Sequence, residues 1–178
     1  MRQIIVTEFI SADGFAEVDK LPSVTWNSEM DQFKNEELAD SGAILLGRTT
    51  YQIFASHWPD ETGAFAERFN ALPKYVASKA LKELDWQPAE LLKGALPDAA
   101  KKLKEGSGGN IYVHGSISVA HELMRHELVD RIRLLSYPVA LGQGKPLFAP
   151  GEQHKFELIS ATRFGNGVLA LEYLPERH

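Results

Sequence analysis

The sequence predicts one α/β domain, residues 1–178, with a mostly parallel central sheet, helices on both faces and a C-terminal antiparallel hairpin. Two observations carry this prediction. Short apolar runs typical of buried strands alternate with segments of helical spacing, and that alternation builds parallel sheets. The last two strand-like runs are joined by Gly165-Asn166-Gly167, a strong hairpin signal because these residues tolerate positive φ.

The first part of the chain predicts two strands around one helix. Residues 4–10 are β-rich and mostly apolar, as expected for a buried strand. Asn27 and Ser28 can cap a helix whose apolar face extends to Leu38. Residues 43–46 form a short continuous apolar run, which is typical of a central strand buried on both faces.

The middle of the chain predicts mainly helices. Residues 51–54 form a short helical segment after a turn, and residues 65–72 carry Phe and Leu at helical spacing. Residues 74–77 predict another strand. Residues 96–105 predict a helix with one apolar face, which the glycine-rich stretch 106–109 ends.

The last part of the chain returns to strands. Residues 110–113 predict a buried strand, and a helix follows to about residue 125. Residues 131–137 predict the next strand. Residues 156–164 and 168–174 are the two strands of the predicted hairpin.

Composition excludes several classes of function. The chain has no cysteine, so disulfides, thiolate metal sites and cysteine nucleophiles are excluded. The net charge of −5 argues against general attraction to nucleic acid or anionic lipid. No apolar run approaches the ~18 residues that span a membrane, and the N-terminus lacks a signal-peptide pattern. We therefore expect a cytoplasmic protein with no nucleic-acid or membrane partner.

Two strand-to-helix turns are the most informative feature. The first comprises Gly47, Arg48, Thr49 and Thr50, and the second comprises Gly115, Ser116, Ile117 and Ser118. Ligands of open α/β sheets bind beyond the carboxyl ends of the strands. A helix N-terminus there offers free N–H groups to a phosphate, and glycine allows a ligand to approach the backbone. Together the turns could hold the pyrophosphate of a dinucleotide, although both could equally be ordinary helix caps.

Other motifs carry less weight. Neither turn has the G-x-G-x-x-G or G-x-x-x-x-G-K-[ST] pattern, and the segment 142–145 fits a tight loop better than a phosphate loop. His121 and His126 are five residues apart, whereas a helical zinc site needs a spacing of four. We expect no metal site.

Two acids are the nearest candidates for substrate chemistry. Asp13 lies beside a glycine and could simply be a turn residue. Asp31 falls in the first turn of a predicted helix, where the helix dipole alone favours an acid.

Taken together, the motifs resemble a known family. Five short segments of the C-terminal half form one series: Gly115-Ser116, Leu128-Val129-Asp130-Arg131-Ile132, Pro138-Val139, Leu141-Gly142-Gln143-Gly144 and Leu147-Phe148. This series resembles the reductase domain of the bacterial bifunctional riboflavin-synthesis enzyme and its stand-alone relatives, which have the dihydrofolate reductase-like fold. Ser11-Ala12-Asp13-Gly14 resembles that family's Ser-x-Asp-Gly ending of the first strand, and Gly47-Arg48-Thr49-Thr50 resembles its Gly-Arg-x-Thr turn. The likeness covers nearly the whole chain but no deaminase domain, so we expect no deaminase step.

The resemblance implies a cofactor and its site. In dihydrofolate reductases the turn matching residues 47–50 binds the NADPH phosphates. Ser78 and Lys79 match the contact with the adenosine 2′-phosphate, where a cation favours NADPH over NADH. Residues 115–118 match the glycine-rich turn that cradles the pyrophosphate.

The resemblance also implies a substrate side. Trp26 and Asp31 reproduce a Trp followed five residues later by an acid, so Asp31 would hold a pterin-like ring and help to place a proton. Ser11 and Asp13 would complete this side of the site. The riboflavin-type relatives act instead on a ribosylaminouracil phosphate.

We therefore expect an NADPH-dependent oxidoreductase acting on a small heterocycle, with the cofactor supplying the hydride. A non-catalytic module that binds NADPH or a pterin is the alternative. A different enzyme that uses the same turns for another phosphorylated ligand is a third possibility. Relatives pair through their sheets, so the resemblance also implies a homodimer.

Overall fold

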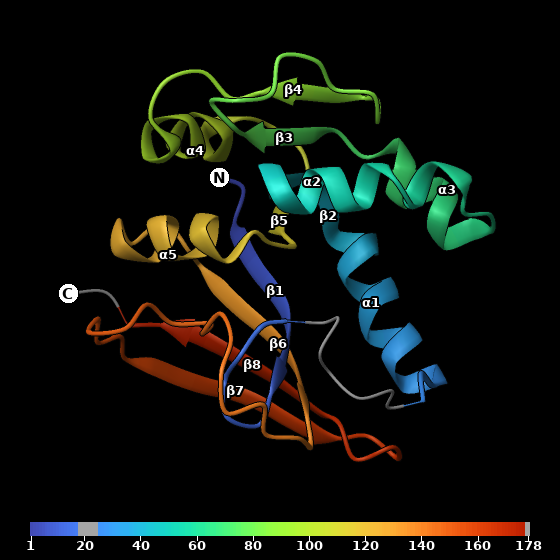
Figure 1. The fold of residues 1–178 in the computed structure, drawn as a ribbon, viewed down its shortest axis with the longest axis vertical. Coiled ribbons are helices and arrows are strands. Elements are labelled where there is room, and N and C mark those ends of the chain that lie inside the picture. Colours follow the sequence, from blue (N-terminus) through green and yellow to red (C-terminus); the bar gives the residue numbers. More distant parts are fainter. Residues whose placement is uncertain (18–24, 177–178) are drawn as a thin grey trace.

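The computed structural model describes residues 1–17 and 25–176, whose strands form one eight-stranded sheet (Figure 1). The order is β4-β3-β2-β5-β1-β6-β8-β7. The first six strands in this order run parallel, and β8 and β7 are antiparallel to their neighbours. The strands are β1 (Ile4–Ser11), β2 (Ser41–Gly47), β3 (Lys74–Ala77), β4 (Ala89–Leu91), β5 (Asn110–Val113), β6 (Arg131–Tyr137), β7 (Phe156–Arg163) and β8 (Leu169–Pro175).

Helices cover both faces of the sheet. Successive side chains of β2 point to opposite faces of the sheet. Leu45 packs on the face covered by α4 and α5, and Leu46 packs on the face covered by α1, α2 and α3. The helices are α1 (Ser28–Asp40), α2 (Arg48–Ala55), α3 (Ala64–Ala71), α4 (Leu96–Glu105) and α5 (Ile117–Arg125), with a short 3-10 helix at Trp58–Asp60. The predicted α/β architecture with its C-terminal hairpin is therefore confirmed.

Most predicted elements are found within a residue or two of their expected bounds. The Asn27 side chain accepts a hydrogen bond from the Met30 N–H and caps α1 as expected. Two details differ from prediction. Helix α2 begins at Arg48 rather than Tyr51, because only Gly47 keeps an extended conformation. The three-residue edge strand β4 was not predicted, since so short a segment carries no periodicity.

A buried polar cluster fixes α1 against β1. The Lys34 ammonium donates to Thr7 Oγ1 at 3.0 Å and to Glu37 Oε2 at 2.6 Å, and Thr7 Oγ1 donates to Glu37 Oε1 at 2.8 Å. Arg133 lies over the Phe33 ring at 4.1 Å and within 3.7 Å of the Glu37 carboxylate. Since buried charges are costly unless paired, this cluster sets how α1 sits on the sheet.

The strand β7 forms the last edge of the sheet and is exposed along almost its whole length. Leu158 and Ile159 are 53% and 45% exposed. An exposed apolar edge strand can pair with another chain.

Candidate functional site

A cleft of about 540 Å³ lies at the carboxyl ends of β2, β3 and β5. Its size is within the usual range for small-molecule sites. Eight of the ten predicted cofactor residues line it: Gly47, Arg48, Thr49, Ser78, Lys79, Ser116, Ile117 and Ser118. These residues come from three separate segments of the chain, so the fold gathers them as the sequence predicted.

The other two predicted residues join the two turns. Thr50 Oγ1 lies 3.2 Å from Ser116 Oγ, and the Gly47 N–H donates to the Gly115 carbonyl at 3.2 Å. The peptide bond between Gly115 and Ser116 is cis. The turns after β2 and β5 therefore form one connected structure.

Both helices that start at the cleft have N-termini without a side-chain cap. Gly47 precedes α2 and Ser116 precedes α5, and neither helix has a side-chain hydrogen bond at its cap position. The first N–H groups of a helix have no partner within it. The cleft therefore presents two sets of donors suited to phosphate oxygens.

Glycine is needed at both turns for reasons of space. A Cβ at Gly47 would lie 2.5 Å from Ser116 Oγ. A Cβ at Gly115, where φ is +104°, would lie 2.7 Å from Thr50 Oγ1 and 3.5 Å from Glu8 Oε1. Neither turn can accept a side chain without rearrangement.

Positive charge gathers around the cleft. Arg48, Lys79 and Lys145 are exposed, and none forms an ion pair within residues 1–17 and 25–176. Lys145 was not predicted, because it reaches the site from a distant loop. The His121 ring nitrogen Nε2 lies 3.1 Å from the Pro146 carbonyl and so joins that loop to α5. The residues present thus fit an anionic ligand with several phosphates.

Ser11 and Asp13 form part of a loop junction. The Asp13 carboxylate accepts hydrogen bonds from Ser11 Oγ at 2.6 Å, from the Leu141 N–H at 3.0 Å and from the Gly142 N–H at 2.7 Å. These bonds, led by that of Ser11, lower the Asp13 pKa from 3.8 to about 2. The structure therefore gives Asp13 a positioning role between two loops, and its predicted contact with substrate stays a prediction.

Trp26 and Asp31 lie on the α1 side of the molecule. The Trp26 indole N–H donates to Asp31 Oδ1 at 2.5 Å, and both side chains are exposed. Neither lines the cleft just described. The pairing follows from their spacing across the helix start, and the proton-placing role of Asp31 stays a prediction.

Besides Lys145, the sequence analysis also missed Glu8, which lies beside the site. Glu8 on β1 is 9% exposed, and its Oε1 is shielded from water with no hydrogen-bond partner in the described part of the chain. Burial raises its pKa from 4.5 to about 8, against the opposing effect of Lys34. A carboxyl group within a mostly apolar, buried strand is itself a sequence signal.

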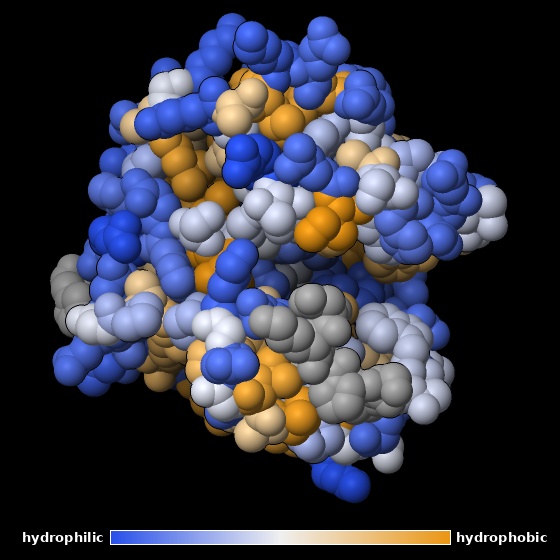
Figure 2. Space-filling model, in the orientation of Figure 1, coloured by the Kyte–Doolittle hydropathy of each residue, from blue (hydrophilic) through white to orange (hydrophobic). Residues whose placement is uncertain are grey.

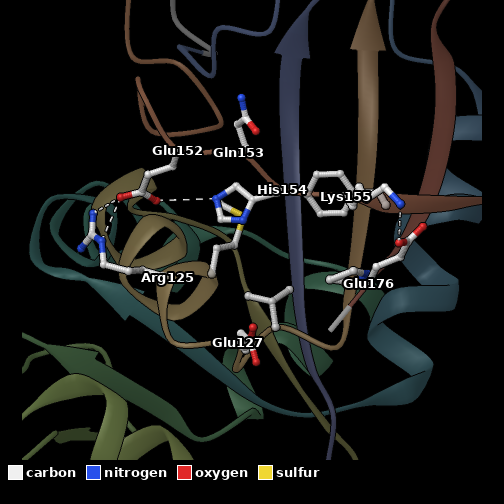
Figure 3. A pocket seen from close by; sticks show the side chains of 11 residues that line it. Arg125, Glu127, Glu152, Gln153, His154, Lys155 and Glu176 are labelled. Carbon is white, nitrogen blue, oxygen red and sulfur yellow. Dashed lines mark hydrogen bonds and ion pairs between the residues drawn. The ribbon is translucent and has the colours of Figure 1, made fainter. Parts of the chain in front are cut away.

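A second pocket, of about 350 Å³, lies at the other end of α5 (Figure 3). Arg125 Nη2 lies 2.7 Å from Glu152 Oε1, and His154 lies 3.6 Å from the other oxygen of that carboxylate. Lys155 lies 3.1 Å from Glu176. Because each of these basic side chains has a carboxylate neighbour, the pocket differs from the first cleft, where Arg48, Lys79 and Lys145 have none among the described residues.

Comparison with known proteins identifies the family. The model of the RibD C-terminal domain matches residues 2–170. The chain belongs to the RibD C-terminal domain family. Among proteins similar to this member is the uncharacterized protein YyaP of Bacillus subtilis (strain 168), 29% identical, with the alignment covering 97% of this chain and 94% of YyaP. The uncharacterized protein YwjB of the same organism is 25% identical over 94% of this chain and 95% of YwjB.

Solved structures share the RibD C-terminal domain fold. A putative riboflavin biosynthesis protein from Shewanella sp. PV-4 has a TM-score of 0.79 at 22% identity, covering 98% of this chain and 99% of that chain. A pyrimidine reductase-like protein from Corynebacterium diphtheriae has a TM-score of 0.67 at 14% identity, covering 99% and 93%. These likenesses confirm the predicted dihydrofolate reductase-like fold.

Proposed function

We propose that this protein is an NADPH-dependent reductase that transfers a hydride to a small heterocyclic substrate. The gathering of eight predicted cofactor residues in one cleft, beside two uncapped helix N-termini, is the observation that carries the proposal. In this assignment the two turns bind the pyrophosphate. Lys79 binds the 2′-phosphate, and Arg48 supplies a fixed cation.

The cofactor would supply a hydride from its dihydronicotinamide to the carbon of a C=N or C=O bond, becoming NADP⁺. The nitrogen or oxygen of that bond takes a proton. The protein's part is to hold the reacting groups together and to exclude water. Asp31 is the residue for which we propose proton placement at the substrate, with Trp26 holding its carboxylate.

The substrate class follows the family. A putative riboflavin biosynthesis protein and a pyrimidine reductase-like protein share the fold, which supports a ribosylaminouracil phosphate-like substrate. The spacing of Trp26 and Asp31 supports a pterin-like substrate. Ser11 and Asp13 lie where the first strand ends and would complete that side.

A non-catalytic NADPH- or pterin-binding module is the second candidate. It is favoured by the loop contacts of Asp13, which engage both of its oxygens. Loss of NADPH absorbance on mixing with dihydrofolate or a ribosylaminouracil phosphate would support the reductase over the module.

Nucleotide titration tests the cofactor assignment. NADPH and NADH are titrated into the protein, and quenching of its three Trp residues is followed. Arg48→Ala should weaken both nucleotides about tenfold or more, the loss expected for a charged hydrogen bond. Lys79→Ala should weaken NADPH alone. Lys82→Ala, an exposed lysine three residues further on that does not line the cleft, is the matched control.

Folded protein that binds neither nucleotide would overturn the proposal. Equal effects of Lys79→Ala and Lys82→Ala would remove the assignment of the 2′-phosphate site.

The cellular setting and assembly are proposed with the function. Within residues 1–17 and 25–176, no helix is long and apolar enough to cross a membrane. We place the protein in the cytoplasm and propose a homodimer in which β7, with its unpaired edge and exposed apolar side chains, meets a second copy.

A further inference from the structure

The carboxyl edge of the sheet arranges the proposed cofactor residues in a spatial order. Lys79 follows β3, Arg48 follows β2 and Gly115 follows β5, and these strands are neighbours in that order (Figure 1). The next strand along the same edge is β1. Three strand spacings separate β3 from β1, which is roughly 14 Å. A dinucleotide that lies along this edge with its 2′-phosphate at Lys79, after β3, therefore has its nicotinamide end near β1.

Glu8 occupies that end of the series. The parallel register of β1 with β5 pairs Val6 with Val113, and its continuation by two residues brings Glu8 level with Gly115. A Cβ added to Gly115 would lie 3.5 Å from Glu8 Oε1, so the Glu8 carboxyl is directly beside the turn after β5. Glu8 is thus the acidic neighbour of the proposed pyrophosphate turn on its β1 side.

The Glu8 carboxyl also has unused hydrogen-bonding capacity. Its Oε1 has no partner within the described residues and no contact with water, a costly state for a buried polar atom. The other buried carboxyl beside this part of the sheet, that of Glu37 on α1, is bonded to Thr7 and Lys34. A site that leaves one carboxyl oxygen unpaired at its reacting end suits a ligand that supplies the missing donor.

We propose, building on the reductase function above, that the carboxyl of Glu8 binds the carboxamide of the nicotinamide. A protonated carboxyl has one donor and one acceptor, and a primary amide has the complementary pair. The O–H of Glu8 donates to the amide oxygen, and Oε1 accepts from the amide N–H. This makes Glu8 a cofactor-contacting residue that selects the nicotinamide end of the ligand.

The surroundings of Glu8 keep its carboxyl neutral at physiological pH. Burial raises its pKa to about 8, while the ammonium of Lys34 on α1 opposes that shift. Burial lowers the pKa of His114, the residue before Gly115, well below its usual value, so its ring stays uncharged. Lys74 also has a pKa lowered to about 8 by burial, but it starts β3 at the opposite end of the strand from the cleft.

Equilibrium binding of two nucleotides at several pH values tests the inference. NADPH carries the carboxamide, and adenosine 2′,5′-bisphosphate lacks the nicotinamide and measures the phosphate sites alone. Wild-type protein should bind NADPH about tenfold more weakly at a pH well above 8 than at pH 7, an effect of one lost hydrogen bond. The bisphosphate should show no such change.

Three variants distinguish a direct contact between Glu8 and the nicotinamide from an indirect effect of Glu8 on nucleotide binding. Glu8→Gln keeps a donor and an acceptor without titrating, so its NADPH affinity should stay near the wild-type value and lose the decline above pH 8. Glu8→Leu should bind NADPH about tenfold more weakly at every pH, with unchanged affinity for the bisphosphate. The control is Thr7→Val, which changes the neighbour of Glu8 whose side chain faces the opposite side of β1. This variant should leave the ratio of NADPH affinity to bisphosphate affinity unchanged.

Several results would overturn the inference. Glu8→Leu binding NADPH as tightly as wild type would do so, as would an unchanged pH dependence in Glu8→Gln. Equal losses of NADPH and bisphosphate binding in Glu8→Leu would mean that Glu8 only supports the turn. Failure of folded wild-type protein to bind either nucleotide would instead refute the proposed function itself.

Discussion

Replacement of Glu8 by Gln should remove a pH-dependent cost to the stability of the ligand-free protein. In the unfolded chain the Glu8 pKa is near its ordinary 4.5, and burial in the folded protein raises it to about 8. Between these values the folded state retains a proton that the unfolded state has lost. Stability contributed by this group is therefore full below pH 4.5 and falls as pH rises towards 8.

The magnitude follows from the two pKa values. Each pH unit within the window changes the free energy of unfolding by about 1.4 kcal/mol. From pH 5 to pH 7 the wild-type protein should lose about 3 kcal/mol relative to Glu8→Gln, whose side chain does not titrate. For a chain of 178 residues this corresponds to a relative change in Tm of roughly 6 to 12 °C.

Urea denaturation of both proteins at pH 5, 6 and 7, followed by circular dichroism, measures the difference directly. Groups that titrate equally in the two proteins cancel, so only the slope of the difference matters. Parallel stability curves across this range would show that Glu8 is ionised in the folded protein and would refute the reasoning.

Three further predictions concern other parts of the molecule. Gly115→Ala should lower stability by about 1–3 kcal/mol, because its Cβ would lie 2.7 Å from a hydroxyl oxygen on α2 at a φ of +104°; an unchanged urea midpoint would contradict this. Asp13→Asn should speed hydrogen exchange of the Gly142 N–H at neutral pH. In the wild-type protein, the hydrogen bond from this N–H to the Asp13 carboxylate should hold above pH 3.8 and weaken as the pH falls to about 2. Leu158→Lys should convert the proposed dimer to a monomer in light scattering, and Ile53→Lys, at an apolar side chain on α2 that is 59% exposed, should not.

Local signals explain why the gathering of the two turns at one cleft could be predicted. The segments 47–50 and 115–118 each follow a buried apolar strand and start a helix, so their positions at the sheet edge follow from chain direction alone. The sequence could not show that Thr50 and Ser116 lie 3.2 Å apart, because 66 residues separate them.

Long-range packing explains what the sequence missed. Glu8 has its special environment because Gly115 is beside it, and that neighbour is set by the pairing of β1 with β5. Lys145 reaches the cleft through a loop joined to α5 by His121. By contrast, the hydrogen bond between Trp26 and Asp31 follows from their spacing of five residues. That spacing does not say how far the two side chains lie from the cleft.

The order of strands also has an evolutionary consequence. The proposed phosphate contacts come from the ends of β2, β3 and β5, whereas Asp13, Trp26 and Asp31 come from β1, α1 and the residues around them. In the proposed function, substitutions that alter the choice of reactant can therefore accumulate in one short stretch of the gene while the proposed nucleotide contacts are preserved elsewhere. On that assignment, a single ancestral scaffold can diversify in substrate specificity without passing through a form that has lost its proposed cofactor contacts.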